Sequence, residues 1–108
     1  MDGFSVSYTD DALQDLRDIY SYISGELRSS RVAAAQVKRI REEVRALGLF
    51  PKRYKAVAWE PWKSREMRQM PVDNFIVFYV VDDEAQAVHI VRIFYGKRDI
   101  PNIVGNDR

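Results

Sequence analysis

The sequence predicts an α+β domain of two layers, in which an N-terminal strand and a helical hairpin pack on one face of a mostly antiparallel sheet. Two observations carry this prediction. In the last third of the chain, two dense apolar runs, residues 74–81 and 88–95, flank the polar stretch 82–87, which is typical of paired strands. Upstream, apolar residues recur at helical spacing over two stretches. Helices grouped on one face of an antiparallel sheet define this fold class.

Length and composition limit the kind of protein. Residues 1–108 are predicted to form a single domain, because a chain of this length supports one hydrophobic core. No run approaches the ~18 apolar residues of a membrane span, and the N-terminus lacks the pattern of a signal peptide. We therefore expect a cytoplasmic protein with no membrane contact. With no cysteine and one histidine, neither a disulfide nor a zinc site nor another cofactor is expected.

Charge is unevenly distributed along the chain, although the formal net charge is only +1. Most of the charged residues in the range 1–26 are acidic, whereas most of those in the range 38–68 are basic. This division indicates a basic surface that meets an anion, an acidic peptide or nucleic acid. For the helical part, a solvated helix face with ion pairs is an equally good interpretation.

The N-terminal segment is predicted to form a strand followed by a helix. Residues 4–8 alternate between apolar and polar side chains, which indicates a half-buried strand. Thr9 or Asp10 is the expected N-cap of the helix. Its apolar stripe is predicted to consist of Leu13, Leu16, Tyr20, Ile23 and Leu27, widened by Ala12 and Ile19.

A second helix is predicted after a short break at residues 28–30, with Ser29 or Ser30 as its cap. Its apolar stripe is Ala33, Val37, Ile40, Val44 and Leu47. Gly48 is expected to end the helix in the left-handed conformation, and Pro51 prevents its continuation. The two helices form an antiparallel hairpin, whose apolar face needs the sheet as its partner.

The segment after the hairpin is predicted to lead into the sheet. Residues 54–59 are a candidate weak strand. Residues 60–63 are predicted to be a loop, because Pro61 disfavours a helical conformation at the residue before it. Residues 65–72 are a predicted strand, in which Pro71 indicates a sheet edge, an end or a bulge.

The last two strands are predicted to form the centre of the sheet. Residues 75–81 are apolar at both parities, which predicts a strand that is covered on both faces. Residues 88–95 form the next strand, which Gly96 ends. From Pro101 onward we expect a short, frayed tail.

Several polar residues near the last strands are candidate functional residues. Arg92 lies in an otherwise almost uncharged strand, and a buried guanidinium needs an acidic partner, an open cleft or an anion. A carboxylate such as Glu66 is the structural alternative. Because Arg92 and Tyr95 are three residues apart, a regular strand directs them to opposite faces, so a bulge or a strand end near Phe94 is needed to unite them. His89 is expected to be packed or edge-exposed, without a catalytic role.

Cleavage of RNA without a metal needs a base, cations for the phosphate charge and an acid. A base at Glu60, phosphate-binding arginines and an acid at Tyr95 would suffice. The candidate catalytic residues are therefore Glu60, Arg68, Arg92 and Tyr95. The candidate RNA- or phosphate-binding residues are Lys63, Arg65, Lys97 and Arg98.

Three segments carry a family resemblance over almost the full length of the chain. Residues 15–23 match a D-L-x-D-I-Y-x-Y-I string, residues 68–79 an R-x-L-x-V-x-N-Y-x-I-x-Y string, and residues 92–99 an R-V-L-H-G-R-R-D type of string. In this order and at this spacing they resemble the RelE/ParE superfamily of bacterial type II toxins. The resemblance implies the RelE/ParE-like fold.

The resemblance also implies a toxin that is neutralised by a cognate antitoxin, which binds through an extended or helical segment. In this family the antitoxin usually carries the DNA-binding domain, so operator DNA would be contacted only through it. Members divide by target. RelE-like and YoeB-like toxins cleave mRNA on the ribosome, whereas ParE-like toxins poison DNA gyrase and are not nucleases.

The residues point to both targets. Glu60-Pro61-x-Lys63 resembles the E-P-L-K stretch of YoeB-like toxins, and Arg92-x-x-Tyr95 resembles their R-Y-H-Y string. These two resemblances favour ribosome-dependent mRNA cleavage, by a metal-independent RNA endonuclease, as the first hypothesis. Three replacements count against the nuclease hypothesis, because an arginine, a histidine and a tyrosine of the nucleases correspond here to Ile76, Phe94 and Val104. The alternatives are a ParE-like gyrase poison, in which the hairpin and the basic tail act, and a toxin that only binds its antitoxin.

Overall fold

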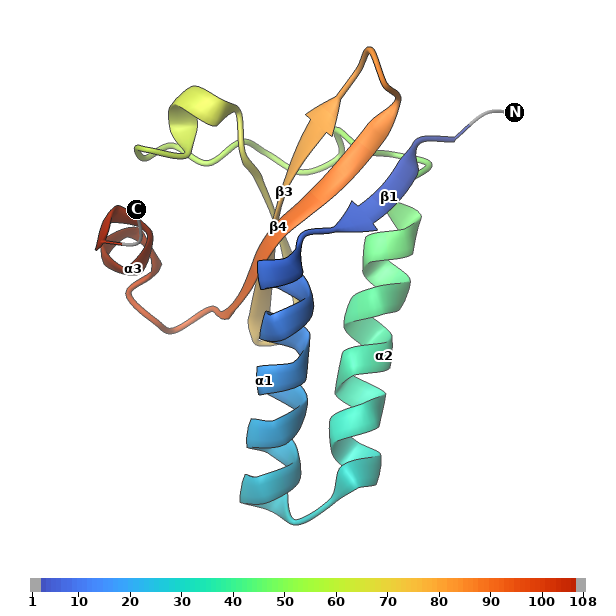
Figure 1. Ribbon diagram of the computed structural model, residues 1–108, viewed down its shortest axis with the longest axis vertical. Helices are drawn as coiled ribbons and strands as arrows, with labels where there is room; N and C mark the ends of the chain where they lie inside the picture. Colours follow the sequence, from blue (N-terminus) through green and yellow to red (C-terminus); the bar gives the residue numbers. More distant parts are fainter. Residues whose placement is uncertain (1–2, 107–108) are drawn as a thin grey trace.

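The computed structural model describes residues 3–106 and has the predicted α+β architecture (Figure 1). Its elements in chain order are β1 (Ser5–Tyr8), α1 (Asp10–Leu27), α2 (Ser30–Ala46), the 3-10 turn η1 (Lys63–Arg65), β2 (Arg68–Val72), β3 (Phe75–Asp82), β4 (Ala87–Tyr95) and α3 (Ile100–Asn106). The strand order is β1-β4-β3-β2. β1 runs parallel to β4, and the other neighbours are antiparallel.

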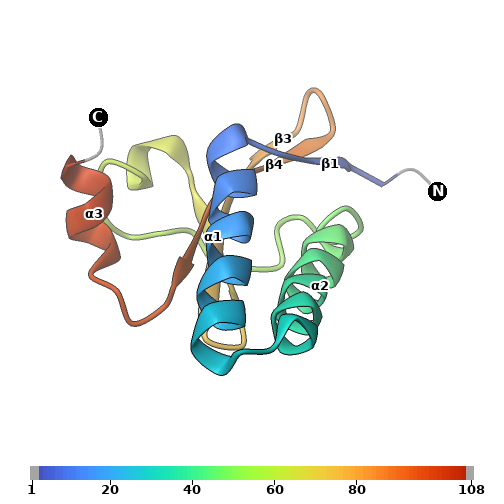
Figure 2. The ribbon, with the colours of Figure 1, turned by 60° about the horizontal axis from the view of Figure 1, so that its bottom comes forward.

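The two long helices begin at the predicted caps. The Thr9 hydroxyl accepts a hydrogen bond from the Ala12 amide at 3.0 Å, and the Ser29 hydroxyl accepts one from the Val32 amide at 3.2 Å. Arg28, which has a positive φ of 51°, ends α1. α1 and α2 lie side by side as an antiparallel hairpin on one face of the sheet (Figures 1 and 2).

The main core lies between this hairpin and the sheet. α2 buries the stripe that the sequence predicts, with Val37 half-buried at its margin. α1 differs in part, because its buried residues are Ala12, Leu16 and Ile19, which belong to the predicted stripe and its margin, and Asp15, which does not. Tyr20 and Leu27, expected in this stripe, are 37% and 61% exposed. The small Ala12 and the ion-paired Asp15 lie next to the sheet and set the rotation of the helix.

Gly48 follows α2 without the expected left-handed conformation. No glycine in the described part of the chain has a positive φ, and the residue that ends α2, Leu47, is right-handed. The glycine is needed for a close approach instead. Its carbonyl accepts a hydrogen bond from the Phe4 amide at 2.7 Å, and a Cβ at Gly48 would lie only 2.8 Å from the Phe4 carbonyl oxygen. The end of α2 is thereby tied to the start of β1.

β3 and β4 form the centre of the sheet, and β3 is covered on both faces as predicted. Val77 and Tyr79 face the hairpin, whereas Phe78 faces the opposite side. The register passes from the pair Phe78 and Arg92 to the pair Tyr79 and Ile90. This irregularity leaves the intervening residue of β4 as a β-bulge. β2, which contains the proline, is the edge strand at the far side.

A second core covers the sheet face that is turned away from the hairpin. Its buried residues are Val57, Trp62, Met67, Phe78, Phe94, Ile100 and Val104. Residues 100–106 are therefore a helix rather than the expected frayed tail; the end of that predicted tail, residues 107 and 108, lies outside the described part. Ile100 and Val104 are four residues apart, so α3 presents both to the sheet.

The connection between α2 and β2 wraps around the β2 edge of the sheet. The predicted weak strand at residues 54–59 is reduced to one isolated bridge, between Ala56 and Arg68. The predicted strand 65–72 begins only at Arg68, because Glu66 takes a positive φ of 57° after η1. Trp62 then stacks on Trp59 and packs against Phe78 on the far face.

Candidate functional site

The guanidinium of Arg92 is held by the carboxylate of Asp15 in α1. Arg92 Nε donates to Asp15 Oδ2 at 2.8 Å, and Nη2 donates to Oδ1 at 3.0 Å. The two side chains are 21% and 10% exposed. Bidentate geometry with little solvent gives strong, charge-assisted hydrogen bonds. Among the described residues 3–106, Arg92 is thus ion-paired with Asp15 rather than with Glu66, the example suggested by the sequence.

Asp15 also completes the edge of β4 beyond the end of β1. The pairing of β1 with β4 stops at Tyr8 and Ile90. Past this point, the Thr9 hydroxyl donates to the Val91 carbonyl at 2.9 Å, and the Ile93 amide donates to Asp15 Oδ2 at 2.9 Å. Side chains of the β1–α1 region thus satisfy backbone groups that a sheet edge would otherwise expose. The Arg92 and Asp15 pair consequently holds α1 against the sheet.

Arg92 and Tyr95 lie on opposite faces of β4. Arg92 is paired with Phe78, and its Cζ is 4.5 Å from the ring centroid of Phe94. Tyr95 is paired with Phe75, and their ring centroids are 5.9 Å apart. The β-bulge precedes Arg92 instead of lying between the two residues. It therefore leaves the alternation from Arg92 to Tyr95 intact, and the two side chains do not share a site.

Glu60 lies in an exposed loop and is hydrogen-bonded to Ser64 of η1. Its Oε1 accepts a hydrogen bond from the Ser64 amide at 3.0 Å, and its Oε2 accepts one from the Ser64 hydroxyl at 2.8 Å. These hydrogen bonds lower the pKa of Glu60, and the charge of Lys63 acts in the same direction. A general base that works near neutral pH needs a raised carboxyl pKa. The local structure thus tunes Glu60 away from that role.

Arg68 is used to anchor the loop that follows α2. Its Nη1 donates to the Tyr54 carbonyl at 2.7 Å and lies 3.4 Å from the Lys52 carbonyl. Tyr79, its partner across β2 and β3, donates its hydroxyl hydrogen to the Pro51 carbonyl at 2.8 Å. Both side chains therefore hold the loop on the hairpin side of the sheet.

The four predicted phosphate-binding residues are exposed and come from two segments of the chain. Lys63 and Arg65 belong to η1, whereas Lys97 and Arg98 follow β4. The Cζ of Arg98 lies 5.6 Å from the ring centroid of Phe94, the ring that Arg92 also covers. The structure thus brings Arg92 and Arg98 to one ring, and it leaves the predicted catalytic residues in separate environments.

Neither a metal site nor a membrane-spanning element is found in residues 3–106. No group of three or more His, Asp or Glu side chains in this part could hold a metal ion. None of its helices combines the length and apolar character needed to cross a bilayer.

His89, half-buried in β4, has its Nδ1 3.1 Å from the Ser7 hydroxyl oxygen, a packed arrangement of the kind expected.

Comparison with known proteins decides the family. Residues 6–100 match the family described as the ParE toxin of the type II toxin–antitoxin system parDE. The chain belongs to this family. It is thus a toxin of the RelE/ParE superfamily, as the three sequence segments indicate. No curated protein matches the chain closely enough to serve as a relative.

Solved structures agree with the fold of this ParE-family toxin. A chain of the chromosomal ParDE toxin–antitoxin system from Pseudomonas aeruginosa has a TM-score of 0.70 and 23% identity, over 85% of this chain and 95% of that one. A chain of the RelBE2 toxin–antitoxin complex from Mycobacterium tuberculosis has a TM-score of 0.62 and 22% identity, over 86% of this chain and 98% of that one. The isolated RelE toxin from Escherichia coli has a TM-score of 0.52 and 15% identity, over 94% of this chain and 95% of that one. At these identities the similarity shows the shared fold.

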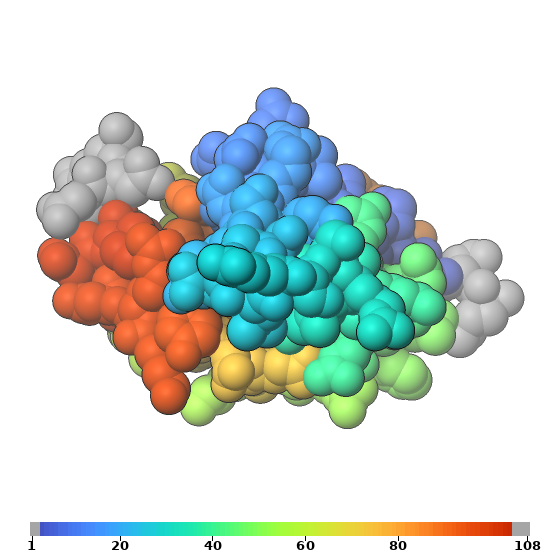
Figure 3. Space-filling model, turned by 90° about the horizontal axis from the view of Figure 1, so that it is seen from below, coloured from blue at the N-terminus to red at the C-terminus, as the bar shows by residue number. Residues whose placement is uncertain are grey.

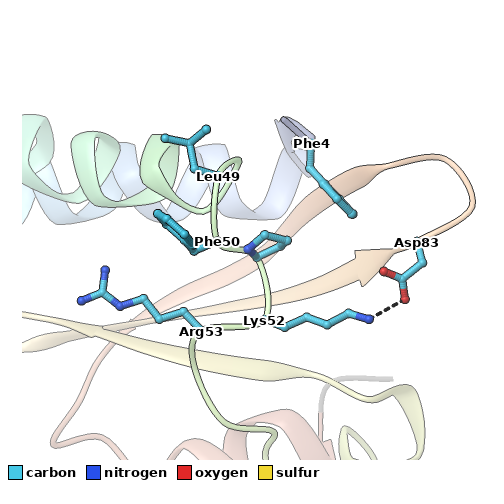
Figure 4. A pocket seen from close by; sticks show the side chains of 7 residues that line it. Phe4, Leu49, Phe50, Lys52, Arg53 and Asp83 are labelled. Atoms are coloured by element: carbon cyan, nitrogen blue, oxygen red, sulfur yellow. Dashed lines mark hydrogen bonds and ion pairs between the residues drawn. The ribbon is translucent and has the colours of Figure 1, made fainter. Parts of the chain in front are cut away.

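The ParE-family toxin has an apolar hollow of about 720 Å³ between the start of β1 and the loop after α2 (Figure 4). It is lined by Phe4, Leu49, Phe50, Pro51, Lys52, Arg53 and Asp83. Leu49 and Phe50 are 62% and 64% exposed. Lys52 reaches Asp83 with 2.8 Å between its Nζ and the carboxylate oxygen, and this ion pair borders the hollow.

A second hollow, here called the hairpin groove, has a volume of about 370 Å³ and is formed by the two long helices. It is lined by Tyr20, Ala34, Val37, Lys38, Arg41, Glu42 and Arg45. Arg41 connects the groove to β1, since its Cζ lies 5.1 Å from the ring centroid of Tyr8. Burial raises the pKa of Tyr8, against the opposing effect of the charges of Arg41 and Arg45. The groove thus combines apolar side chains with cations.

Proposed function

We propose that this ParE-family toxin arrests growth by binding and poisoning DNA gyrase, and that it does not cleave mRNA. The observation that carries the proposal is the position of the candidate catalytic residues. Arg92 is hydrogen-bonded to Asp15, Tyr95 lies on the other face of β4, and Glu60 is hydrogen-bonded to Ser64 of η1. Acid–base catalysis requires these groups within hydrogen-bond reach of one reacting phosphate. We thus place gyrase poisoning ahead of mRNA cleavage, whereas the sequence motifs favour mRNA cleavage first.

The hairpin supports a mode of action that depends on binding. At its tip, Tyr22 is 69% exposed, Leu27 is 61% exposed and Val32 is 45% exposed. The space-filling view from below has this tip in front, with the C-terminal segment set to one side (Figure 3). Large exposed apolar residues at one end of a helical hairpin are candidates for an interaction surface. We therefore assign the contact with gyrase to the hairpin, assisted by the basic residues after β4.

A cognate antitoxin is the second proposed partner. The similar chains from Pseudomonas aeruginosa and Mycobacterium tuberculosis both come from toxin–antitoxin systems. By analogy, an antitoxin encoded beside this toxin would neutralise it, and contact with operator DNA would be made through that antitoxin.

Glu60→Gln and Tyr95→Phe are expected to leave growth arrest within about threefold of the unmodified toxin, whereas loss of an essential acid or base would cost about 10²–10⁴-fold. Both side chains are exposed, and Gln at position 60 keeps an oxygen that can accept the hydrogen bond from the Ser64 amide, so the fold should be retained. The measurement is the rate of translation and of DNA synthesis within minutes of induction in a bacterium. We expect DNA synthesis to stop first, with DNA breaks that are bound to gyrase.

Tyr22→Ser is the companion variant, because it changes only an exposed side chain of the hairpin tip. We expect it to weaken the inhibition of gyrase-dependent supercoiling in vitro. The proposal would be wrong if translation collapsed first, if ribosome-bound messages were cut, and if Glu60→Gln abolished this cleavage.

A further inference from the structure

The hairpin tip, residues 22–32, is built from residues that do not favour its backbone geometry. Arg28 ends α1 in the left-handed conformation, with a φ of 51° and a ψ of 40°. Glycine is the usual residue at such a helix end, because a Cβ is strained in this conformation. The single glycine of α1 lies three residues earlier, at Gly25, where it has no positive φ. Glycine weakens a helix by comparison with alanine, so both positions cost stability.

Gly25 has no packing role within the part of the chain that the structure describes. It is exposed, and a Cβ at this position would have no atom within 4 Å beyond the nearby backbone of its own helix. At Gly48, by contrast, a Cβ would lie only 2.8 Å from a carbonyl oxygen. Alanine would therefore fit in place of Gly25 and would strengthen α1. The glycine leaves a free space on the outer surface of the helix.

Charges at the hairpin tip are also placed against the helix dipoles. The last turn of α1 contains Glu26 and no basic residue, and the first turn of α2 contains Arg31 and no acidic residue. Acids stabilise the N-terminus of a helix, and bases stabilise its C-terminus. The opposite ends of the same two helices follow this rule, with Asp10 and Asp11 at the start of α1 and Arg45 in the last turn of α2. The departure is therefore confined to the tip.

The surface at Gly25 combines an exposed aromatic side chain with the two arginines of the tip. Tyr22, which is 69% exposed, precedes Gly25 by three residues and is thus its neighbour on the helix surface. Arg28 and Arg31 are exposed, and none of the ion pairs found in residues 3–106 includes them. This end of the hairpin extends beyond the sheet, where another molecule can approach it (Figure 1).

We infer that an α-helix of gyrase crosses α1 at Gly25 and directs a carboxylate at Arg28 and Arg31. This inference deepens the proposed function and rests on it. Two helices pack at interaxial distances of about 8–10 Å, which depend on the side chains at the crossing. A glycine at that point lets the two backbones approach closely. The hairpin tip thus gives up local stability for close contact with its target, a common compromise at binding sites.

A protein helix fits the hairpin tip better than DNA does. Leu27 and Val32, which are 61% and 45% exposed, add apolar surface to the tip, and an amphipathic helix buries its apolar face against such a surface. Glu26 directly follows Gly25 and would repel a phosphate backbone at the crossing. A single carboxylate on a partner helix can instead meet the arginines of the tip.

The test measures binding of the full-length toxin to purified gyrase holoenzyme by surface plasmon resonance, first without DNA and then with it. Gly25→Leu should bind about tenfold more weakly, because its side chain fills the space that the partner helix occupies. Gly25→Ala adds one methyl group and should bind about two- to threefold more weakly. Both variants should nevertheless unfold at a higher temperature than the unmodified toxin, since both new residues favour a helix. Opposite changes in binding and stability separate this role from a purely structural one.

Arg31→Glu tests the charges of the hairpin tip. It should weaken binding about tenfold, although the new acid stabilises the N-terminus of α2. Glu43→Leu is the matched control for Gly25→Leu, because it introduces the same side chain at an exposed position near the other end of α2. This control should bind gyrase as the unmodified toxin does. Circular dichroism confirms that each variant is folded.

Three results would overturn the inference while leaving gyrase as the target. These are unchanged binding of Gly25→Leu, a full loss of binding already in Gly25→Ala, which would point to helix flexibility, and unchanged binding of folded Arg31→Glu. Binding that appeared only in the presence of DNA would assign the tip to nucleic acid instead. Failure of the unmodified toxin to bind gyrase in either condition would overturn the proposed function and this inference together.

Discussion

Asp15→Ala is expected to destabilise the folded protein by about 3–5 kcal/mol, the usual cost of removing one partner from a buried ion pair. The Arg92 guanidinium, 21% exposed, would lose both of its short hydrogen bonds to the carboxylate. The buried amide of Ile93 would lose its acceptor at the same time. Urea unfolding at neutral pH, followed by tryptophan fluorescence, measures the change in the free energy of unfolding.

Asp18→Ala is the matched control on the same helix. Asp18 is exposed and accepts a hydrogen bond from the Gln14 side chain at 2.8 Å, so its replacement should change stability by less than about 0.5 kcal/mol. A double variant, Asp15→Leu with Arg92→Met, should recover much of the loss, because apolar pairs of similar volume often replace buried ion pairs without cost. If Asp15→Ala unfolded like the unmodified protein, the ion pair would not be what attaches α1 to β4.

The sequence predicts most of the fold because the pattern of its apolar residues is clear. The run at residues 75–81 is apolar at both parities, and both faces of β3 are indeed covered. What covers the far face could not be predicted. α3 has only seven residues, including a proline and a glycine, and so short a helix is not stable alone. It forms because Ile100 and Val104 are buried against the sheet.

The buried face of α1 was predicted wrongly in part because, like α3, it depends on contacts with a distant part of the chain. A search for apolar stripes selects Tyr20 and Leu27 and passes over Asp15, because a carboxylate is seldom buried. Asp15 can be buried because Arg92, 77 residues further along the chain, and the backbone amide of Ile93 supply its partners. The sequence contained a signal for this contact, namely an arginine in an apolar strand that requires an acid. It offered no means of choosing among the acids of the chain.

The candidate site shows why residue types alone do not locate an active site. Glu60, Arg68, Arg92 and Tyr95 could perform the chemistry of RNA cleavage if they met. Whether Arg92 and Tyr95 meet depends on the position of one β-bulge, which lies before Arg92. Hydrogen bonds of Glu60 to Ser64 and of Arg68 to backbone carbonyls, too, depend on turns that the pattern does not specify.

Trp62→Ala is expected to destabilise the protein by about 3–5 kcal/mol, the usual effect of truncating a large buried aromatic residue. Trp62 is 5% exposed, and its ring centroid lies 4.7 Å from that of Phe78 and 5.4 Å from that of Trp59. The cavity would open in the second core, directly beneath β3. The free energy of unfolding in urea, measured by circular dichroism, gives the size of the loss.

The location of the damage is as informative as its size. Regions with their own packing can open separately from the rest of a domain, so Trp62→Ala should raise hydrogen exchange most in α3 and in residues 55–67. The hairpin packs in the main core and should change less. Lys63→Ala, an exposed neighbour, should leave stability within about 0.5 kcal/mol of the unmodified protein. A loss below about 1 kcal/mol for Trp62→Ala would mean that the far face of β3 does not depend on this cover.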